Sequence, residues 1–327
     1  GRCRGSGLEG SVGVFVGVMY EEYQLWGAGA HARSTPRAVL GSPSSIANRV
    51  SYSLNLHGPS IAVDTMCSSS LTAIHLACRE LRYGQCDMAI AGGVNVSIHP
   101  NKYLLLPQGQ FASSTGRCGS FGEGGDGYVP AEGVGAVVLK PLSRAVADGD
   151  HVYAVVKGTA VNHGGRTKGY TVPNPVAQAH AIRRALHEAR VPARAVSYIE
   201  AHGTGTTLGD PIEIAGLVRA FSEHTTDRQF CAIGSVKSNI GHAESAAGIA
   251  ALTKVLLEMR HASLVKPLHA DVPNPHIDFA STPFVLQREF GEWRRPRLPI
   301  GGVEQEYPRT AGISSVGAGG CKCYLLL

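Results

Sequence analysis

Cys67 stands where a thiol can become a nucleophile. In the stretch VDTMCSSSLTAIHLAC it lies between a short apolar run, residues 61–63, and a cluster of serines. The run predicts a buried strand, and the residues after the serines predict a helix that begins near Cys67. Serine hydroxyls accept bonds from the free N–H groups of a helix N-terminus, whose dipole lowers the pKa of a thiol. The alternative is a small cysteine that fills space in the core.

Two histidines lie in turns rich in small residues. His202 closes a strand expected over residues 196–201 and enters the turn HGTGT, at the sheet edge where α/β proteins place functional groups. The glycines of this turn let the backbone approach a ligand, and the hydroxyls of Thr204 and Thr206 can bond an amide chain. His242 lies in the stretch VKSNIGHAESAAG. Either histidine alone could instead be structural, because imidazoles readily bond to backbone groups.

Short strands and helices alternate along the whole chain, which predicts an α/β fold with buried central strands. A loop rich in glycine and serine covers residues 113–127. Strands are expected at 12–18, 61–63, 88–96, 135–139, 152–160, 196–199 and 232–236, and helices at 176–189, 212–221 and 246–259.

Two segments resemble each other and indicate a duplicated fold. Residues 61–81 and 232–259 both read as a strand, a polar turn and a helix of small residues. Cys67 marks the expected helix start in the first segment, and His242 marks it in the second. A pseudo-twofold axis would bring the two helix starts together, although helical segments can also resemble each other by chance.

The composition excludes several classes of protein. The chain has 327 residues, of which 43% are hydrophobic and 17% charged, with a formal charge of +5. This is a globular composition, and the spread of Lys and Arg argues against nucleic-acid binding. No apolar run has the length of a membrane span, and no signal-peptide pattern opens the chain.

The eight cysteines form neither a disulfide scaffold nor a metal site. No CxxC pair and no spaced Cys/His set is present, and Cys321 and Cys323 make only a lone C-x-C. No bound metal is therefore expected. Free thiols suit a reducing compartment, so we expect a cytoplasmic protein.

The chain resembles the β-ketoacyl synthases, the condensing enzymes of fatty-acid and polyketide assembly. The motifs DTMCSSS, RCGSFGEGGDGYVPAEG, EAHGTGT, KSNIGH and PNPHIDF occur in family order, with GISSVGAGG beyond them. The resemblance implies a thiolase-like fold of two pseudo-symmetric halves, 1–150 and 151–327, in α/β/α/β/α layers. It also implies a homodimer. The sequence around Cys67, together with the stretch VNHGGRTKGYTVPNP, is most similar to ketosynthase domains of modular polyketide synthases served by separate acyltransferases.

The resemblance assigns a role to each motif residue. Cys67 would take an acyl chain from the phosphopantetheine arm of an acyl carrier protein. A malonyl-type extender would then lose CO₂, and its enolate would attack the Cys67 thioester. His202 and His242 would stabilise the negative charge as N–H donors. Lys237 would organise the histidines. Without the motif, Lys237 would be interpreted as a solvated lysine.

Further residues are placed by the same resemblance. Thr204 and Thr206 would contact the pantetheine chain, which comes on the carrier protein, so no cofactor is bound directly. Val316 and Gly317 would form the channel gate and the oxyanion loop, beside the backbone N–H of Cys67. Other domains of a polyketide synthase are expected partners. We interpret Asp64 as fixing the nucleophile turn, and the remaining cysteines as structural: Cys3, Cys78, Cys86, Cys118 and Cys231.

The sequence departs from the family pattern in three places. The family has a strand ahead of Val12, so the chain is expected to be N-terminally truncated, which would expose a sheet edge and puts independent folding in question. Val316 replaces the phenylalanine of GISSFG, which leaves control of acyl entry in doubt. The continuation GG-x-N-A-H is replaced by GGCKCYLLL, through sequence error or domain decay, and the tail is not relied on for function.

Several functions remain open at this point. An elongating ketosynthase is favoured, because non-elongating ketosynthases, which only pass the acyl chain on, commonly lose the HGTGT histidine. An inactive scaffold that docks carrier proteins is the third candidate. A degradative thiolase would use a second cysteine where this chain has histidine, and a cysteine hydrolase has no reason for HGTGT or KSNIGH.

Overall fold

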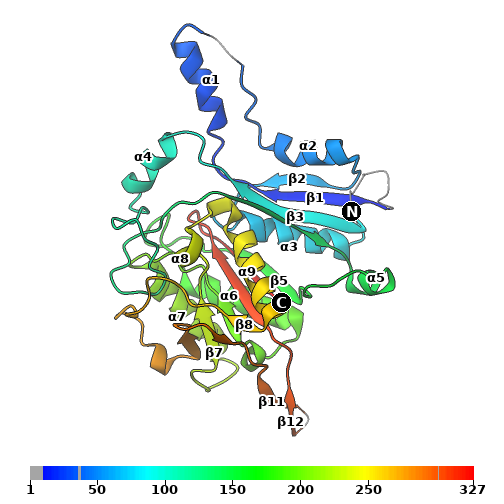
Figure 1. Cartoon of the computed structure of the whole chain (residues 1–327), viewed down its shortest axis with the longest axis vertical. Coiled ribbons are helices and arrows are strands. Elements are labelled where there is room, and N and C mark those ends of the chain that lie inside the picture. The colour runs from blue at the N-terminus through cyan, green and yellow to red at the C-terminus, as the bar shows by residue number, and fades with distance from the viewer. Residues whose placement is uncertain (1–9, 36–37, 301) are drawn as a thin grey trace. The chain divides into compact units, whose positions relative to one another are not determined.

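The computed structural model describes residues 10–35, 38–300 and 302–327 (Figure 1). The chain forms two compact units, and each is described by itself. Unit 1 comprises the chain up to residue 110, with 131–151 and 244–249, and unit 2 comprises 111–130, 152–243 and 250–327. Cys3, which we interpreted as structural, lies outside the described residues.

Unit 1 is built on a four-stranded sheet in the order β2-β1-β3-β4. The first three strands run parallel and β4 is antiparallel to β3. Residues of β1 (VGVFVG) are almost all buried, as expected for a parallel strand covered on both faces. The strands are β1 (Val12–Gly17), β2 (Ser60–Val63), β3 (Met88–Asn95) and β4 (Gly133–Leu139), which confirms the four strands predicted in this part of the chain.

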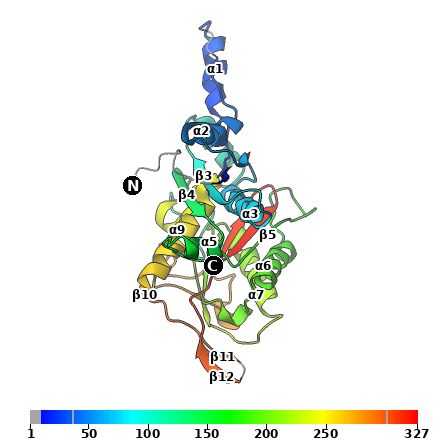
Figure 2. The ribbon, with the colours of Figure 1, turned by 90° about the vertical axis from the view of Figure 1, so that its right-hand side faces the viewer.

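Among the described residues, five helices lie wholly in unit 1, and α3 is the one that positions Cys67. It begins at Ser69, close to the predicted start, and its first two turns are buried. In Figures 1 and 2, α1 extends away from the sheet of its unit, whereas α2 and α3 lie along it. The helices are α1 (Tyr23–Ala32), α2 (Ser44–Leu54), α3 (Ser69–Arg82), α4 (Asn101–Gln108) and α5 (Leu142–Ala147).

Small residues let α3 pack closely in unit 1. A Cβ atom at Gly17 of β1 would lie 2.4 Å from the backbone nitrogen of Ser70, so only glycine fits there. On its other side, a Cβ at Gly248 would lie 2.6 Å from Leu71. The Ser70 hydroxyl accepts a bond from Ile249 N at 3.1 Å. The start of α3 is therefore held between β1 and residues 248–249.

Unit 2 contains a six-stranded sheet in the order β5-β14-β13-β6-β7-β9. The strand predicted over 152–160 is wrong at its start, because Gly158 pairs with Leu326, where β14 ends, and residues 152–157 have no partner strand. The tail GGCKCYLLL contributes β14, a largely buried strand between β5 and β13. The strands are β5 (Gly158–His163), β6 (Tyr198–Glu200), β7 (Cys231–Gly234), β9 (Phe284–Leu286), β13 (Ala311–Val316) and β14 (Cys321–Leu326).

Helices of unit 2 begin and end at recognisable signals. The Asn174 side chain caps α6 (Pro175–Ala189) by accepting from Val176 N and Ala177 N. Helix α7 (Gly209–Phe221) follows the HGTGT turn. Both match the predicted helices at 176–189 and 212–221.

His242 does not mark a helix start, contrary to the prediction. The short α8 (Lys237–Ile240) precedes it, and a 3₁₀ turn (Glu244–Ala246) separates it from α9 (Ala247–His261). Glu244 has a φ of +44°, and a right-handed helix cannot include this conformation. The helix predicted at 246–259 is present as α9.

Four short strands and two 3₁₀ turns, Ala193–Ala195 and Phe279–Ser281, complete the architecture of the described residues. The strands β8 (Ser263–Leu264) and β10 (Gly291–Glu292) pair with each other, and β11 (Arg297–Ile300) and β12 (Val303–Glu306) form a hairpin that Figure 1 shows projecting from its unit. The 3₁₀ turn Phe279–Ser281 precedes β9.

Two buried tyrosine hydroxyls of unit 2 differ in their hydrogen bonding. Tyr324 of β14 is 1% exposed, and its hydroxyl has no hydrogen-bond partner among the described residues. The Tyr198 hydroxyl, also buried, donates to Glu200 at 2.7 Å and accepts from Lys254 at 2.6 Å. An unpaired buried hydroxyl costs free energy, whereas a paired one contributes it.

We therefore expect opposite effects from two matched substitutions. Tyr324→Phe should raise the free energy of unfolding by about 1 kcal/mol, because it removes an unsatisfied group. Tyr198→Phe should lower it by about 1–3 kcal/mol, because it leaves a buried charged pair with fewer partners. Urea denaturation of the two variants checks this, and a loss of stability in Tyr324→Phe would contradict it.

Candidate active site

The turn that carries Cys67 is held in a strained conformation. Strand β2 ends at Val63, and the Asp64 carboxylate accepts a bond from Met66 N at 2.7 Å. Met66 has a φ of +56°, which a residue other than glycine rarely adopts. The Ser69 hydroxyl accepts from Thr65 N at 2.9 Å. Asp64 and Ser69 thus stabilise the turn from both ends.

The serines after Cys67 do not cap α3 in the predicted way. Ser68, the N-cap residue, makes no side-chain capping bond, and its hydroxyl donates to Thr65 O at 2.8 Å. The Ser69 hydroxyl lies 2.6 Å from Met66 O. The expected satisfaction of the first helical N–H groups by serine is wrong, because these hydroxyls bond to the turn before the helix. Cys67 itself is 6% exposed.

The structure brings the two predicted histidines together in unit 2. The His202 ring lies 5.4 Å from the His242 ring, centroid to centroid, at an interplanar angle of 85°. His242 N donates to Val129 O at 2.7 Å, and its ring packs against Tyr128 at 4.6 Å. The two imidazoles are therefore held in a T-shaped contact from separate turns of one unit.

His202 is kept neutral by its surroundings. Burial, and then the charge of Lys237, lower the pKa of His202 well below its usual value. Lys237 is 2% exposed, so the interpretation of it as a solvated lysine is wrong. The Nδ1 atom of His202 is buried and has no hydrogen-bond partner among the described residues. At neutral pH the ring is a neutral imidazole, which can donate one N–H to a ligand.

Two carboxylates that the sequence analysis missed fix the backbone of the HGTGT turn. Glu213 accepts from His202 N at 2.7 Å and from Gly203 N at 2.8 Å. Asp210 accepts from Gly205 N at 3.1 Å and from Phe121 N at 2.7 Å. Burial raises the pKa of Asp210 to about 7 and also raises that of Glu213. Their i, i+3 spacing on one face of α7 was the available signal.

The loop predicted over 113–127 packs directly on the HGTGT turn. Gly127 N donates to Gly205 O at 3.2 Å, and the Thr207 hydroxyl donates to Gly125 O at 3.1 Å. A Cβ at Gly125 would lie 2.6 Å from Gly205 O, so this contact requires glycine. Glycines in this loop thus permit backbone contact with the turn that carries His202.

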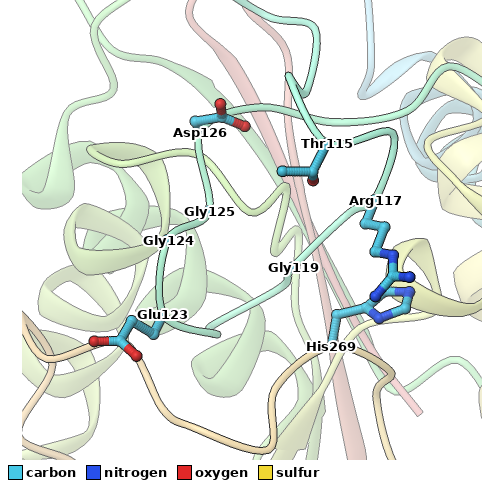
Figure 3. Close-up of a pocket in the computed structure, with 8 residues that line it drawn as sticks. All are labelled: Thr115, Arg117, Gly119, Glu123, Gly124, Gly125, Asp126 and His269. Atoms are coloured by element: carbon cyan, nitrogen blue, oxygen red, sulfur yellow. The ribbon is translucent and has the colours of Figure 1, made fainter.

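This loop lines a pocket of about 370 Å³ in unit 2 (Figure 3). Figure 3 shows the Arg117 and His269 side chains next to each other on one side of the pocket, whereas the Glu123 and Asp126 side chains lie apart from them. Asp126 accepts a bond from Ser114 N at 3.2 Å. The sequence analysis identified neither Arg117 nor His269, and only the motif around Arg117 could have drawn attention to it. The lining residues are Thr115, Arg117, Gly119, Glu123, Gly124, Gly125, Asp126 and His269.

The other predicted site residues of unit 2 lie in defined turns. The hydroxyls of Thr204 and Thr206 are 3.1 Å apart, and that of Thr206 accepts from Gly209 N. Val316 ends β13 and is 8% exposed. Gly317 N donates to Cys321 O at 2.7 Å, which closes the turn between β13 and β14. Cys67 belongs to unit 1, and all these residues belong to unit 2.

Four other cysteines have surroundings unfavourable to a thiolate. Burial raises the pKa of Cys78 and of Cys118 to about 11, and it also raises the pKa of Cys86 and Cys231. No group of three or more His, Cys, Asp or Glu side chains in residues 10–35, 38–300 and 302–327 is arranged to hold a metal ion. In the same ranges, no helix combines the length and apolar character needed to cross a membrane.

Comparisons with known proteins place these features in a family. The model "Beta-ketoacyl synthase, N-terminal domain" matches residues 3–145, and "Beta-ketoacyl synthase, C-terminal domain" matches residues 153–271. Polyketide synthase PksL of Bacillus subtilis (strain 168) is 65% identical over 327 residues, which are 100% of this chain and 7% of PksL. Polyketide synthase ThaG of Burkholderia thailandensis is 63% identical over 100% of this chain and 6% of its own length.

Solved structures agree with these matches. The oxazolomycin ketosynthase domain OzmH KS7 of Streptomyces albus JA3453 has a TM-score of 0.93 and 59% identity, over 97% of this chain and 54% of that chain. The ketosynthase from module 6 of the bacillaene synthase of Bacillus subtilis 168 has a TM-score of 0.88 and 40% identity, over 97% of this chain and 53% of that chain. The predicted thiolase-like α/β fold is thereby confirmed.

The charge of Lys237 gives a prediction about His202. Lys237→Met removes the second cause of the lowered pKa of His202 and leaves burial, so that pKa should rise without reaching its usual value. The fraction of His202 that is protonated just below neutral pH should increase. NMR titration of the imidazole checks this. An unchanged titration in a folded variant would contradict the electrostatic role of Lys237.

Proposed function

The chain belongs to the β-ketoacyl synthase family, and we propose from this premise that it catalyses decarboxylative condensation in a polyketide synthase. The acyl chain would be bound to Cys67, and the extender would be a malonyl-type unit on an acyl carrier protein. Two relatives at 65% and 63% identity are polyketide synthases, which supports this class of substrate. Service by separate acyltransferases is part of the proposal.

The first step is acyl transfer to Cys67. The thiolate attacks the carbonyl carbon of a carrier-bound thioester, and the pantetheine thiol leaves with a proton as the new thioester forms. The position of Cys67 just before α3, beyond a strained turn, supports this role. The backbone N–H of Cys67 and one from the turn after Val316 would bind the carbonyl oxygen.

The second step depends on the histidine pair, and this pair is the observation that carries the proposal. Breaking the C–C bond of the malonyl group releases CO₂ and leaves an enolate, whose oxygen becomes negative. The N–H groups of His202, a neutral imidazole, and of His242 can stabilise that oxygen, and the two rings lie 5.4 Å apart. The enolate carbon then attacks the Cys67 thioester, and the thiolate leaves.

Two other functions stay as alternatives. A non-elongating ketosynthase would perform the first step only, and the low pKa of His202, which keeps an N–H donor neutral, favours elongation over it. An inactive scaffold that docks carrier proteins is disfavoured by the same residues. We also retain the homodimer and a cytoplasmic location as proposals, and seven described cysteines that form no disulfide suit a reducing compartment.

The pocket beside the HGTGT turn suggests where the pantetheine arm enters. Thr204 and Thr206 would bond the amides of the arm, and the loop that packs on their turn lines the pocket. A pantetheine arm ends in a phosphate, and Arg117 at the pocket side could bind it by charge-assisted hydrogen bonds. His269 would support this contact.

Substitution of His202 separates the two steps. His202→Ala should reduce CO₂ release from radiolabelled malonyl-carrier protein by about 10²–10³-fold, because one oxyanion donor is lost. Acylation of Cys67, followed by intact mass, should persist. His187→Ala, which changes an exposed histidine of α6 in the same unit, is the control and should leave both steps unchanged. An acylated wild-type protein that releases no CO₂ would instead support the non-elongating alternative.

Substitution of Arg117 tests the entry of the arm. Arg117→Ala should raise the KM for acyl-carrier protein about tenfold, since a hydrogen bond to a charged group contributes about 1.5–3 kcal/mol. Acylation by a short N-acetylcysteamine thioester, which has no phosphate, should not change. Arg194→Ala, which removes a surface ion pair with Asp227, serves as the control. Equal effects on both substrates would contradict phosphate binding by Arg117.

A further inference from the structure

Unit 1 buries a group of charged and polar side chains that the proposed mechanism does not use. We call it the Lys102 cluster, and its members are Tyr20, Glu22, Asn95, Lys102 and Glu244. Lys102 and Glu244 form an ion pair in which both side chains are 0% exposed. Glu22 is 7% exposed and Asn95 is 1% exposed. A buried ion pair contributes little net stability unless further bonds satisfy it, so a cluster of this kind calls for another explanation.

Hydrogen bonds orient the ion pair on several sides. Asn95 Nδ2 donates to Glu244 Oε2 at 3.0 Å, and the Tyr20 hydroxyl bonds to the same carboxylate. Lys102 Nζ donates to Ser97 Oγ at 3.0 Å and lies 4.9 Å from the centre of the Tyr20 ring. The ammonium of Lys102 is therefore held between a carboxylate, a hydroxyl and an aromatic face.

Backbone strain coincides with this cluster. Tyr20 has a φ of +61° and Glu244 has a φ of +44°, in the left-handed region that favours glycine. Met66, directly before Cys67, has a φ of +56°. Such conformations cost free energy and persist only where surrounding contacts hold them, most often at functional sites.

The cluster lies beside the start of α3, and so beside Cys67. The 3₁₀ turn that contains Glu244 contacts α3 and β3. A Cβ at Gly93 of β3 would lie 2.7 Å from Ser245 O and 2.8 Å from Ser70, so these three segments meet at one point. Burial, then the charges of Glu244, Cys67 and Glu22, raise the pKa of Tyr20, which places the thiol within electrostatic reach of the phenol.

We propose that Lys102 and Glu244 are positioning residues for the Cys67 nucleophile. Lys102 supplies the cation that balances the carboxylates beside the thiolate, and Glu244 holds that cation in place. The inference rests on the proposed function, because it assigns the cluster to the residue that becomes acylated. If Lys102 were absent, the carboxylates of Glu244 and Glu22 would disfavour a negative charge on the Cys67 sulfur.

The charged and titratable groups of unit 1 around the thiol define the electrostatic balance. Asp64 lies in the nucleophile turn itself. Tyr20 and Glu22 follow β1, Lys102 belongs to α4, and Glu244 belongs to the 3₁₀ turn before α9. Of the groups just named, all in the described part of unit 1, Lys102 is the one that carries a positive charge.

Two substitutions with opposite expected signs test the proposal. The rate of Cys67 alkylation by iodoacetamide is measured against pH, with the site of labelling identified by mass spectrometry. Lys102→Met should move the pH midpoint of alkylation upward by about one unit, since an opposing cation is lost. Glu244→Gln should move it downward by a similar amount, and Lys102→Met/Glu244→Gln should return it close to the wild-type value.

A merely structural role would give a different pattern. Both single variants would then melt at lower temperature and react with an unchanged midpoint, which would overturn the proposal. Lys140→Met is the matched control, because it removes a lysine of unit 1 that pairs with the half-exposed Asp148 and Asp150. Should Lys102→Met fail to fold, Glu244→Gln and the double variant still decide the sign.

Failure of the proposed function gives a separate result. If wild-type Cys67 is not acylated by carrier-bound thioesters, the proposed function fails, whatever the alkylation midpoints are. If acylation proceeds and the midpoints of both single variants equal that of the wild type, only the inference about Lys102 and Glu244 fails.

Discussion

The action of a buried lysine on the imidazole of His202 is the interaction on which this site depends. Lys237 is buried, and His202 is half-buried with its Nδ1 atom shielded from solvent. Burial first, and then the charge of Lys237, lower the pKa of His202 and keep its ring neutral, because like charges repel each other more strongly in a low dielectric. A neutral imidazole is an N–H donor that carries no charge of its own, which suits it to an oxygen that becomes negative only during reaction.

A donor of this kind is useful only when its direction is fixed. Glu213 fixes it by accepting from the backbone N–H groups of His202 and Gly203, and Asp210 extends the same support to Gly205 and to the glycine-rich loop at Phe121. Both carboxylates come from the first turns of α7, so a single helix holds the turn. The loop packs on that turn through backbone contacts that side chains would prevent.

Local signals in the sequence predicted much of this arrangement, and non-local ones did not. The apolar spacing over 176–189 predicted a helix, and α6 covers it, with Asn174 as its N-cap and a proline as its first residue. Apolar residues at 152–157 also suit a strand, but the partner strand ends at Leu326, which no local pattern records. Likewise the spacing around His242 suits a helix start, and the left-handed Glu244 delays the helix to Ala247. The motif residues were identified because their sequence motifs resemble those of the family. Glu213 was missed because it supports the site only by binding backbone N–H groups.

Three strained backbone conformations could not be predicted from the sequence. Tyr20, Met66 and Glu244 adopt backbone conformations that their side chains disfavour, so nothing in their residue types predicts those conformations. Each is held by contacts: the Asp64 carboxylate bonds Met66 N, and Glu244 carries the ion pair with Lys102. The bond to Met66 N is local, whereas the ion pair joins residues far apart in the sequence. Met66 directly precedes Cys67, and the turn of Glu244 contacts α3, so the contacts of unit 1 that hold these conformations also fix the backbone around Cys67.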